Sequence, residues 1–284
     1  MSFNNLAGAK LKNLLPTAEY TATQNTVDMD LGSVQGFAAF ILDCAGDSGA
    51  GTNPSATFKI QSGSPVAGGS YATEGTNDIP LRNNTNDNIK LAAKWTQSGA
   101  RSIKYVDLLL KRVGTIGGTD TLTLTIEGNS TADPDNSAIG TSVTVVPSTI
   151  GTNYEWVRFT FLNPVSVADT TVYWLVLAGG YTVSTTNRIV WQTTTVASGG
   201  NANVYDSGWA AVTTNSRLFS IQQINYADVT GGGFTAVVAD ASQQILILNT
   251  DNMGQHVRGV LTVAGTDSPA WYGSLNMVYL EKYR

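Results

Sequence analysis

His256 is the only histidine in the chain, so it is the first side chain to consider as a general base. A general base acts on a nucleophile or water within hydrogen-bond reach, and the sequence has no G-x-S-x-G motif to supply a serine nucleophile. Acidic residues are sparse and lie mostly in turn-like segments, so no carboxylate pair for glycoside hydrolysis is indicated. We therefore expect no catalytic residues and a protein that is not an enzyme. His256 and Arg258 belong to the alternating segment HVRGVLTV, which predicts a place on a sheet face or at a contact between subunits.

The segment DPDNS (133–137) contains the oxygen-bearing side chains that a calcium ion prefers. Calcium takes six to eight oxygen ligands, and the loop of an EF-hand places Gly at position 6 and Glu at position 12. This segment lacks that spacing, and Asp-Pro-Asp-Asn is also a common turn sequence. A structural calcium ion near Asp133 and Asp135 is therefore the alternative to a plain turn, and no other metal or cofactor is expected.

Aromatic side chains are the remaining candidates for a ligand site. Five of the six tryptophans fall in the middle of the chain: Trp95, Trp156, Trp174, Trp191 and Trp209. Trp156 and Trp174 lie in strongly apolar segments, which predicts that they belong to a core. Tyr205 and Trp209 lie in the more polar segment NVYDSGWAAV, which favours either an exposed ligand contact or aromatic rings folded back over the domain.

Composition indicates an all-β protein. The chain has 284 residues, of which 42% are hydrophobic and only 13% are charged, and it contains 29 glycines. Low charge with ample hydrophobicity is unlike a disordered chain, and frequent Thr and Val suit strands joined by Gly- and Asn-containing turns. The single cysteine, Cys44, excludes a disulfide within the chain.

The net charge and the apolar segments limit the partners. The net charge is −5 and no basic stripe is visible, so we expect no binding to nucleic acid. No signal sequence and no run of 18 apolar residues is found, so we expect synthesis in a cytoplasm and no membrane segment.

Strand patterns run along most of the chain. In TLTLTIE (121–127) the aliphatic residues point one way and the threonines the other, as in a strand with one buried face. The segments VQGFAAFILD (34–43) and TVYWLVLAGG (171–180) are apolar on both sides. This pattern predicts a strand buried between two layers for the first segment and a central strand for the second. Turn clusters without helical stripes between these strands favour antiparallel β-sandwiches or barrel-like sheets.

The domain organisation is expected to be discontinuous. Three strands, FTAVV, QQILILN and HVRGVLTV, are predicted near the C-terminus, and their best partners are QGFAAFILD and TFKIQ near the N-terminus. We therefore predict one β-domain from residues 25–69 and 222–284, with a second β-sandwich, residues 70–221, inserted into it. Residues 1–24 are predicted to be either a frayed terminus or an extended arm on a neighbouring subunit.

The two ends of the chain resemble a family of tailed-bacteriophage virion proteins regarded as decoration or auxiliary head proteins. The resemblance rests on MDLGSVQGFAAFILDCAG, TFKIQ, YADVTGGGFTAVV and SQQILILNTDNMGQHVRGVLTVAGTDSPAW, with His256 at a position that is aromatic in the family. It implies a protein that binds the outside of the major capsid shell and stabilises it, forms a homotrimer, and is part of the virion. His256 and Arg258 would then be candidate contacts with the capsid or with another subunit.

The middle of the chain resembles the choice-of-anchor and carbohydrate-binding-like β-sandwiches of bacterial surface proteins. The resemblance rests on YVDLLLKRVG, TLTLTIEGNSTADPDNSAIGTS and VSVADTTVYWLVLAGG. It implies a fold much more firmly than a ligand. The expectation for the whole chain is a structural protein of the capsid that displays this insert outward. The alternatives are an adhesin module for a host-surface glycan, with contacts at Tyr205 and Trp209, and a structural protein of the tail or baseplate.

Overall fold

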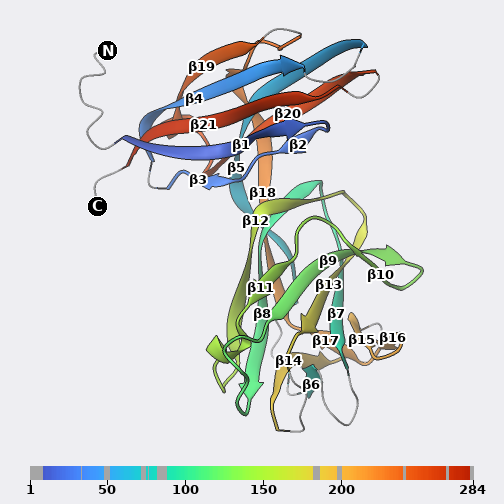
Figure 1. The fold of residues 1–284 in the computed structure, drawn as a ribbon. Coiled ribbons are helices and arrows are strands. Elements are labelled where there is room, and N and C mark those ends of the chain that lie inside the picture. Colours follow the sequence, from blue (N-terminus) through green and yellow to red (C-terminus); the bar gives the residue numbers. More distant parts are fainter. Residues whose placement is uncertain are drawn as a thin grey trace. The chain divides into compact units, whose positions relative to one another are not determined.

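The computed structural model describes residues 9–32, 34–47, 52–71, 75, 77–81, 88–181, 186–196, 200–238, 241–266 and 269–281. Among these residues nearly every regular element is a β-strand, and the only helical turns are the 3-10 helices η1 (Pro147–Thr149) and η2 (Thr250–Asn252). The pairings are antiparallel. The predicted all-β fold with antiparallel sheets is therefore confirmed (Figure 1).

The chain divides into two compact units. Unit 1 contains Met1–Pro65 and Ile224–Arg284, and unit 2 contains Val66–Gln223. The chain leaves unit 1 within β5 (Thr52–Tyr71) and returns to it within β18 (Phe219–Gly233). The boundaries expected from the sequence, at residues 69 and 222, lie next to these crossing points.

Unit 1 is built from two sheets. The first, which we call the β1–β19 sheet, has the order β1-β21-β4-β19. The second has the order β18-β5-β20-β2, with β3 also paired to β20. Besides β5 and β18, the strands are β1 (Ala9–Tyr20), β2 (Gln24–Asn25), β3 (Met29–Asp30), β4 (Val34–Asp47), β19 (Ser242–Asn249), β20 (His256–Thr266) and β21 (Trp271–Glu281). One core joins them and includes Phe40, Phe58, Leu261 and Trp271, all buried.

The N-terminal segment is a correction to the predicted arm. Ala9–Tyr20 form β1, which pairs along its length with β21 of the same chain. Leu14 and Leu15 are buried in the core of unit 1, and their burial stabilises the segment as a strand. Residues 1–8 of the expected arm lie outside the described residues.

The C-terminal stretch also differs from its prediction. β18 runs through the Gly-rich segment to Gly233, and FTAVV, predicted to be a strand, contributes only an isolated bridge between Val237 and Ala56. QQILILN and HVRGVLTV do form strands, β19 and β20. β19 pairs with β4, and β20 pairs with β5. The pairing of the C-terminal strands with QGFAAFILD and TFKIQ is therefore confirmed.

Unit 2 is also built from two sheets. One has the order β10-β9-β13-β7-β15-β16, with β11 on β9, and the other has β17-β14-β8-β18, with β12 on β8 and β6 on β14. The strands are β6 (Asn77–Leu81), β7 (Lys90–Thr96), β8 (Arg101–Val113), β9 (Leu122–Ser130), β10 (Asp133–Ala138), β11 (Val143–Val145), β12 (Glu155–Val167), β13 (Val172–Gly179), β14 (Arg188–Thr195), β15 (Ala202–Tyr205), β16 (Trp209–Val212) and β17 (Asn215–Arg217). A core that includes Leu108, Leu124, Phe159, Leu175 and Trp191 lies between the sheets.

Candidate interaction surface

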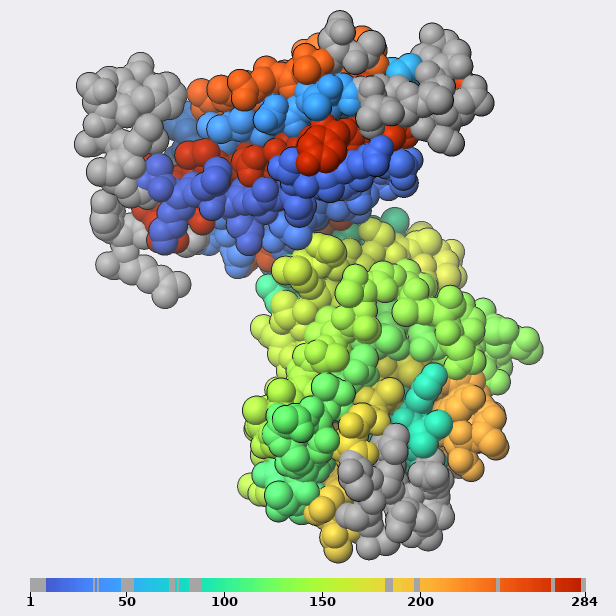
Figure 2. Space-filling view, in the orientation of Figure 1, coloured from blue at the N-terminus to red at the C-terminus, as the bar shows by residue number. Residues whose placement is uncertain are grey.

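The outer face of the β1–β19 sheet in unit 1 is unusually apolar. Of the ten large hydrophobic side chains that are exposed among the described residues, six belong to this sheet: Leu11, Phe37, Ile245, Ile247, Tyr272 and Leu280. Each exposes between 45% and 68% of its surface. Figure 2 shows the four strands side by side on one face of unit 1. Scattered exposed hydrophobics are normal, but a concentration on one sheet indicates an interaction surface.

The alternation of β4 explains why this face exists. Ala38, Phe40 and Leu42 point into the core and are buried, whereas Phe37 on the other side is half exposed. The prediction that this strand lies between two layers is therefore wrong, because no described layer covers its second face. In β4, apolar residues on both sides of the strand therefore mean that one side packs in the core and the other side is an exposed apolar surface.

Strand pairing aligns the exposed hydrophobics in rows across the sheet. Ile247 lies opposite Ala39, Ala39 opposite Val278, and Val278 opposite Leu11. A second row contains Ile245, Ile41, Asn276 and Asn13. Directly opposite residues have their Cβ atoms about 5 Å apart, so each row is continuous. Neither row contains an ionisable side chain. We call the outer side of the β1–β19 sheet, with its six exposed large hydrophobic side chains and these two central rows, the apolar face of unit 1.

His256 and Arg258 do not lie on an exposed surface, which corrects the contact predicted for them. The His256 side chain is 1% exposed, and its Nδ1 lies 2.9 Å from Oδ2 of Asp28. The Tyr226 hydroxyl donates a hydrogen bond to the other oxygen of Asp28. The pair is buried in unit 1, so neither member of it can contact a capsid or a second subunit in this structure.

Arg258 continues this polar network. Its guanidinium lies 3.9 Å from the centre of the Tyr226 ring, and it donates two hydrogen bonds to Oε1 of Gln61. Gln61 in turn donates to Asp228, which also accepts from Lys59. Burial lowers the pKa of Arg258 from its usual range. The network holds β20, β5 and β18 together.

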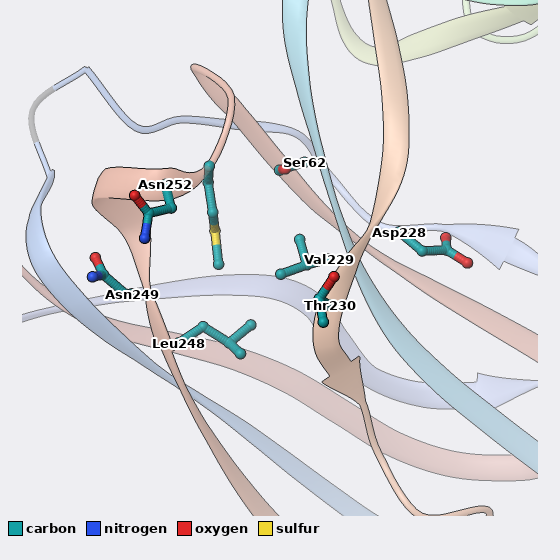
Figure 3. A pocket seen from close by; sticks show the side chains of 8 residues that line it. Ser62, Asp228, Val229, Thr230, Leu248, Asn249 and Asn252 are labelled. Atoms are coloured by element: carbon teal, nitrogen blue, oxygen red, sulfur yellow. The ribbon is translucent and has the colours of Figure 1, made fainter.

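A pocket of about 420 Å³ lies in unit 1. Its lining combines polar and apolar residues: Ser62, Asp228, Val229, Thr230, Leu248, Asn249, Asn252 and Met253. In Figure 3 the two asparagines lie on the opposite side of the pocket from Asp228. The Lys59 and Gln61 hydrogen bonds lower the pKa of Asp228, so this carboxylate is already partnered. Hydroxyl and amide groups around an apolar floor can hold a neutral polar group, but they do not form an acid–base pair.

Tyr205 and Trp209 face each other across the β15–β16 hairpin of unit 2. Their ring centres are 5.0 Å apart in an edge-to-face arrangement. The Trp209 Nε1 donates to Oδ1 of Asn136, and the indole packs against the small cluster of Ala92, Trp174 and Val176. Both rings are half-buried, which agrees with the alternative of aromatics folded back over the domain.

Asp133 and Asp135 are engaged in local hydrogen bonds. The Asn203 amide donates to Asp133, and the Ser137 backbone N–H donates to Asp135. Within the described part of the chain, no group of three or more His, Cys, Asp or Glu side chains is arranged to hold a metal ion. The segment DPDNS lies in strand β10 and not in a turn, so the turn interpretation is wrong.

The predicted core position of Trp156 is wrong, whereas that of Trp174 is confirmed. Trp174 is fully buried and donates from Nε1 to Asn129. Trp156 lies on the outer side of β12 and is 46% exposed. The sequence did contain a signal for this outward position, because Trp156 alternates with Val157, Phe159 and Phe161, which point toward the core.

Glu127, in β9, is a buried carboxylate. It is 4% exposed, its Oε1 accepts from the Thr125 hydroxyl, and its Oε2 has no hydrogen-bond partner. Burial is the main reason why the pKa of Glu127 is raised above 4.5. A buried acid with a raised pKa stabilises the fold most at low pH, and this contribution is lost as the pH rises from about 4.5 through the raised pKa.

We expect Glu127→Gln to stabilise unit 2 at neutral pH by about 1 kcal/mol, because the variant has no buried charge. The free energy of unfolding, measured by denaturant titration between pH 4 and pH 8, should fall less steeply with pH in the variant. Glu155→Gln, at an exposed glutamate of the same unit, is the control and should leave this slope unchanged. Equal slopes for Glu127→Gln and the parent would contradict the expectation.

Comparison with known proteins does not assign this chain to a family. No protein-family model matches the sequence, and no curated protein matches it. Among solved structures, the VP2 subviral particle of infectious bursal disease virus matches 98% of this chain and 83% of its own, with 8% identity and a TM-score of 0.25. T=1 particles derived from infectious bursal virus match 97% of this chain and 77% of their own, with 8% identity and a TM-score of 0.24. TM-scores this low do not define a shared fold. Among the described residues, none forms a helix that is long and apolar enough to span a membrane.

Proposed function

We propose that this chain is a non-enzymatic structural protein of a bacteriophage virion, with the specific role of a capsid decoration protein. Unit 1 binds the outside of the major capsid protein shell, and unit 2 is the module it displays. The observation that carries the proposal is the apolar face of unit 1. The family resemblance of the two chain ends, which together form unit 1, supports it.

The size of the apolar face suits a protein interface. Each of its six exposed large side chains presents on the order of 100 Å² of apolar surface, roughly 600 Å² in total, which is at the upper end for monomeric proteins. A standard interface takes about 800 Å² from each partner. The absence of ionisable side chains from the two central rows matches a partner surface that is itself uncharged. Several copies bound to a symmetric shell would strengthen attachment through avidity.

A charge placed in this face tests the proposal. We expect Ile247→Asp to weaken binding to capsid shells that lack this protein by at least tenfold, because docking would bury an unpaired carboxylate. The measurement is co-sedimentation of purified protein with such shells. The side chain is 55% exposed, so the substitution should leave folding intact.

The matched control is Leu162→Asp, at an exposed leucine of unit 2. It should bind shells as the parent protein does. The proposal is wrong if the parent protein does not bind shells, or if Ile247→Asp binds as well as Leu162→Asp. Imaging of labelled protein on the virion distinguishes a place on the head from a place on the tail or baseplate.

A further inference from the structure

The strand β19 forms an unprotected edge of the β1–β19 sheet. It is the outermost strand of this sheet in Figure 1, and among the described residues it pairs with β4 alone. An edge strand presents unpaired backbone N–H and C=O groups, which proteins usually protect with charges, prolines, bulges or a very short strand. β19 has none of these devices, because its eight residues, SQQILILN, contain no charged residue and no proline, and their register with β4 is unbroken.

Other sheet edges in this chain do carry such protection. The opposite edge of the same sheet, β1, contains Lys10, Lys12 and Pro16, and its pairing with β21 shifts register twice. In the second sheet of unit 1, the edge strand β2 has only two residues. In unit 2, β10 contains Pro134 and β12 contains Pro164, and the register of each is shifted. The contrast with these edges indicates that β19 receives a partner strand.

The Gln244 side chain marks where the open part of this edge begins. It accepts from the Thr235 backbone N–H at 2.8 Å and donates to the Thr235 carbonyl at 2.9 Å. These two hydrogen bonds imitate one pair of a β-ladder and tie the segment after β18 to the first half of β19. From Ile245 to Asn249, the hydrogen bonds to described residues lead only to β4 and η2. This second half of the edge is therefore available to a partner.

The pocket of unit 1 lies beside the second half of this edge. Leu248 and Asn249 of β19 line it, together with residues of β5 and β18 and of the turn that follows β19 (Figure 3). The Asp228 carboxylate of the lining is already hydrogen-bonded, and in Figure 3 it points away from the asparagines. The other polar groups are neutral hydroxyls and amides, which belong to Ser62, Thr230, Asn249 and Asn252.

A strand added to β19 would point a side chain into this pocket. Leu246 and Leu248 lie on the inner side of β19, whereas Ile245 and Ile247 are more than half exposed on its outer side. Residues directly opposite each other on paired strands point to the same face of a sheet. The residue of an added strand opposite Leu248 would therefore share the inner side with Leu248, which lines the pocket.

We propose that β19 and its pocket bind an extended, uncharged segment of a protein partner, which adds a strand to this edge and places an Asn or Gln side chain in the pocket. In strand addition, backbone hydrogen bonds provide affinity, and pockets for alternate side chains provide specificity. The segment is uncharged because β19 has no charged residue and the Asp228 carboxylate is already paired, so a buried charge would have no partner.

A primary amide matches the chemistry of the pocket. It both donates and accepts hydrogen bonds, as the hydroxyls and amides of the lining do. Its methylene stem can pack on Val229 and Leu248. The site is distinct from the apolar face of unit 1, because that face is the outer side of the sheet, whereas β19 offers its backbone groups within the plane of the sheet.

The test measures binding of the full chain to a labelled synthetic peptide, TVTQTVT with blocked ends, by fluorescence anisotropy. The Gln and Val side chains of this peptide share one face when it forms a strand. We expect it to bind about fivefold more tightly than TVTVTVT, which is the effect of one hydrogen bond of about 1 kcal/mol. The Gln peptide with N-methylated backbone amides keeps its side chains but cannot form a ladder, so it should not bind.

Asn252→Ala removes an exposed amide from the pocket. We expect this variant to bind the Gln and Val peptides about equally, because the hydrogen bond to the Gln side chain is lost. Asn163→Ala, at an exposed asparagine of unit 2, is the matched control and should keep the preference of the parent. Thermal unfolding of both variants confirms that they are folded.

The proposal is overturned if neither peptide binds, if the N-methylated peptide binds as well as the unmodified one, or if Asn252→Ala keeps the full preference for Gln. Sedimentation of the parent chain tests a second copy as the occupant: dimers that the Gln peptide dissociates would also overturn the proposal. The inference goes beyond the proposed capsid role and does not rest on it, because the test contains no capsid.

Discussion

Replacing Trp191 with alanine is expected to lower the free energy of unfolding of unit 2 by about 4 kcal/mol, since large aromatic truncations in a core cost about 3–5 kcal/mol. Trp191 lies in β14 and is fully buried in the core between the two sheets. Its Nε1 donates to the Leu218 carbonyl at 2.8 Å, and the Arg217 guanidinium lies 5.3 Å from the centre of the indole ring. The substitution removes this hydrogen bond and leaves a cavity that the stiff surrounding strands cannot close.

The matched control is Trp156→Ala, which truncates the same residue type in the same unit. Its side chain is 46% exposed, so its cost should be within about 1 kcal/mol. Denaturant titration followed by circular dichroism, with hydrogen exchange of β8 and β14, would report both effects. Equal destabilisation by the two substitutions would show that the burial described for Trp191 is wrong.

The second large effect is expected at Asp28 in unit 1. Asp28→Ala should destabilise unit 1 by about 3 kcal/mol, because its removal leaves two buried polar groups, the His256 ring nitrogen and the Tyr226 hydroxyl, without this hydrogen-bond partner. The carboxylate accepts from the Tyr226 hydroxyl and contacts Nδ1 of His256, and both side chains of the His256–Asp28 pair are 1% exposed. The measurement is the free energy of unfolding by denaturant titration at neutral pH.

Asp228→Ala is the control for this prediction. Asp228 also belongs to an ion pair in unit 1, with Lys59, but its side chain is 57% exposed. Exposed pairs contribute about 0–1 kcal/mol, so this variant should be nearly as stable as the parent. Asp28→Asn, which keeps an acceptor oxygen, should recover part of the loss. If Asp28→Ala were no more harmful than Asp228→Ala, the buried network would not stabilise unit 1.

Some strands could be predicted because their pattern depends on local geometry. In β9 the alternation of Leu122, Leu124 and Ile126 with threonines matches a strand whose aliphatic face is buried in the core. In β13 the continuous apolar run matches a central strand, paired on one side with β9 and on the other with β7. Side chains on a strand alternate in every context, so the period is present in the sequence itself.

The same reasoning fails where a second layer decides the outcome. β4 has the apolar pattern of a doubly covered strand, but one of its faces forms part of the apolar face of unit 1. Trp156 has apolar neighbours, but it points outward because its neighbours at odd spacing point inward. His256 lies on an alternating strand, but its burial depends on a partner, Asp28, that is more than 200 residues away in the chain. Contacts between residues so far apart in the sequence cannot be predicted from local patterns.

The sequence by itself determined the all-β class and most of the strand-forming segments, because β-propensity, alternation and turn residues are local properties. The pairing of the chain's two ends was inferred from the need of the late strands for partners. Only the tertiary structure decided which apolar faces are covered. It buried His256 and Arg258, placed Tyr205 and Trp209 against their own sheet, and left Ile247 and Trp156 exposed. The physical reason is that burial depends on the layer opposite a residue, and that layer comes from distant parts of the chain.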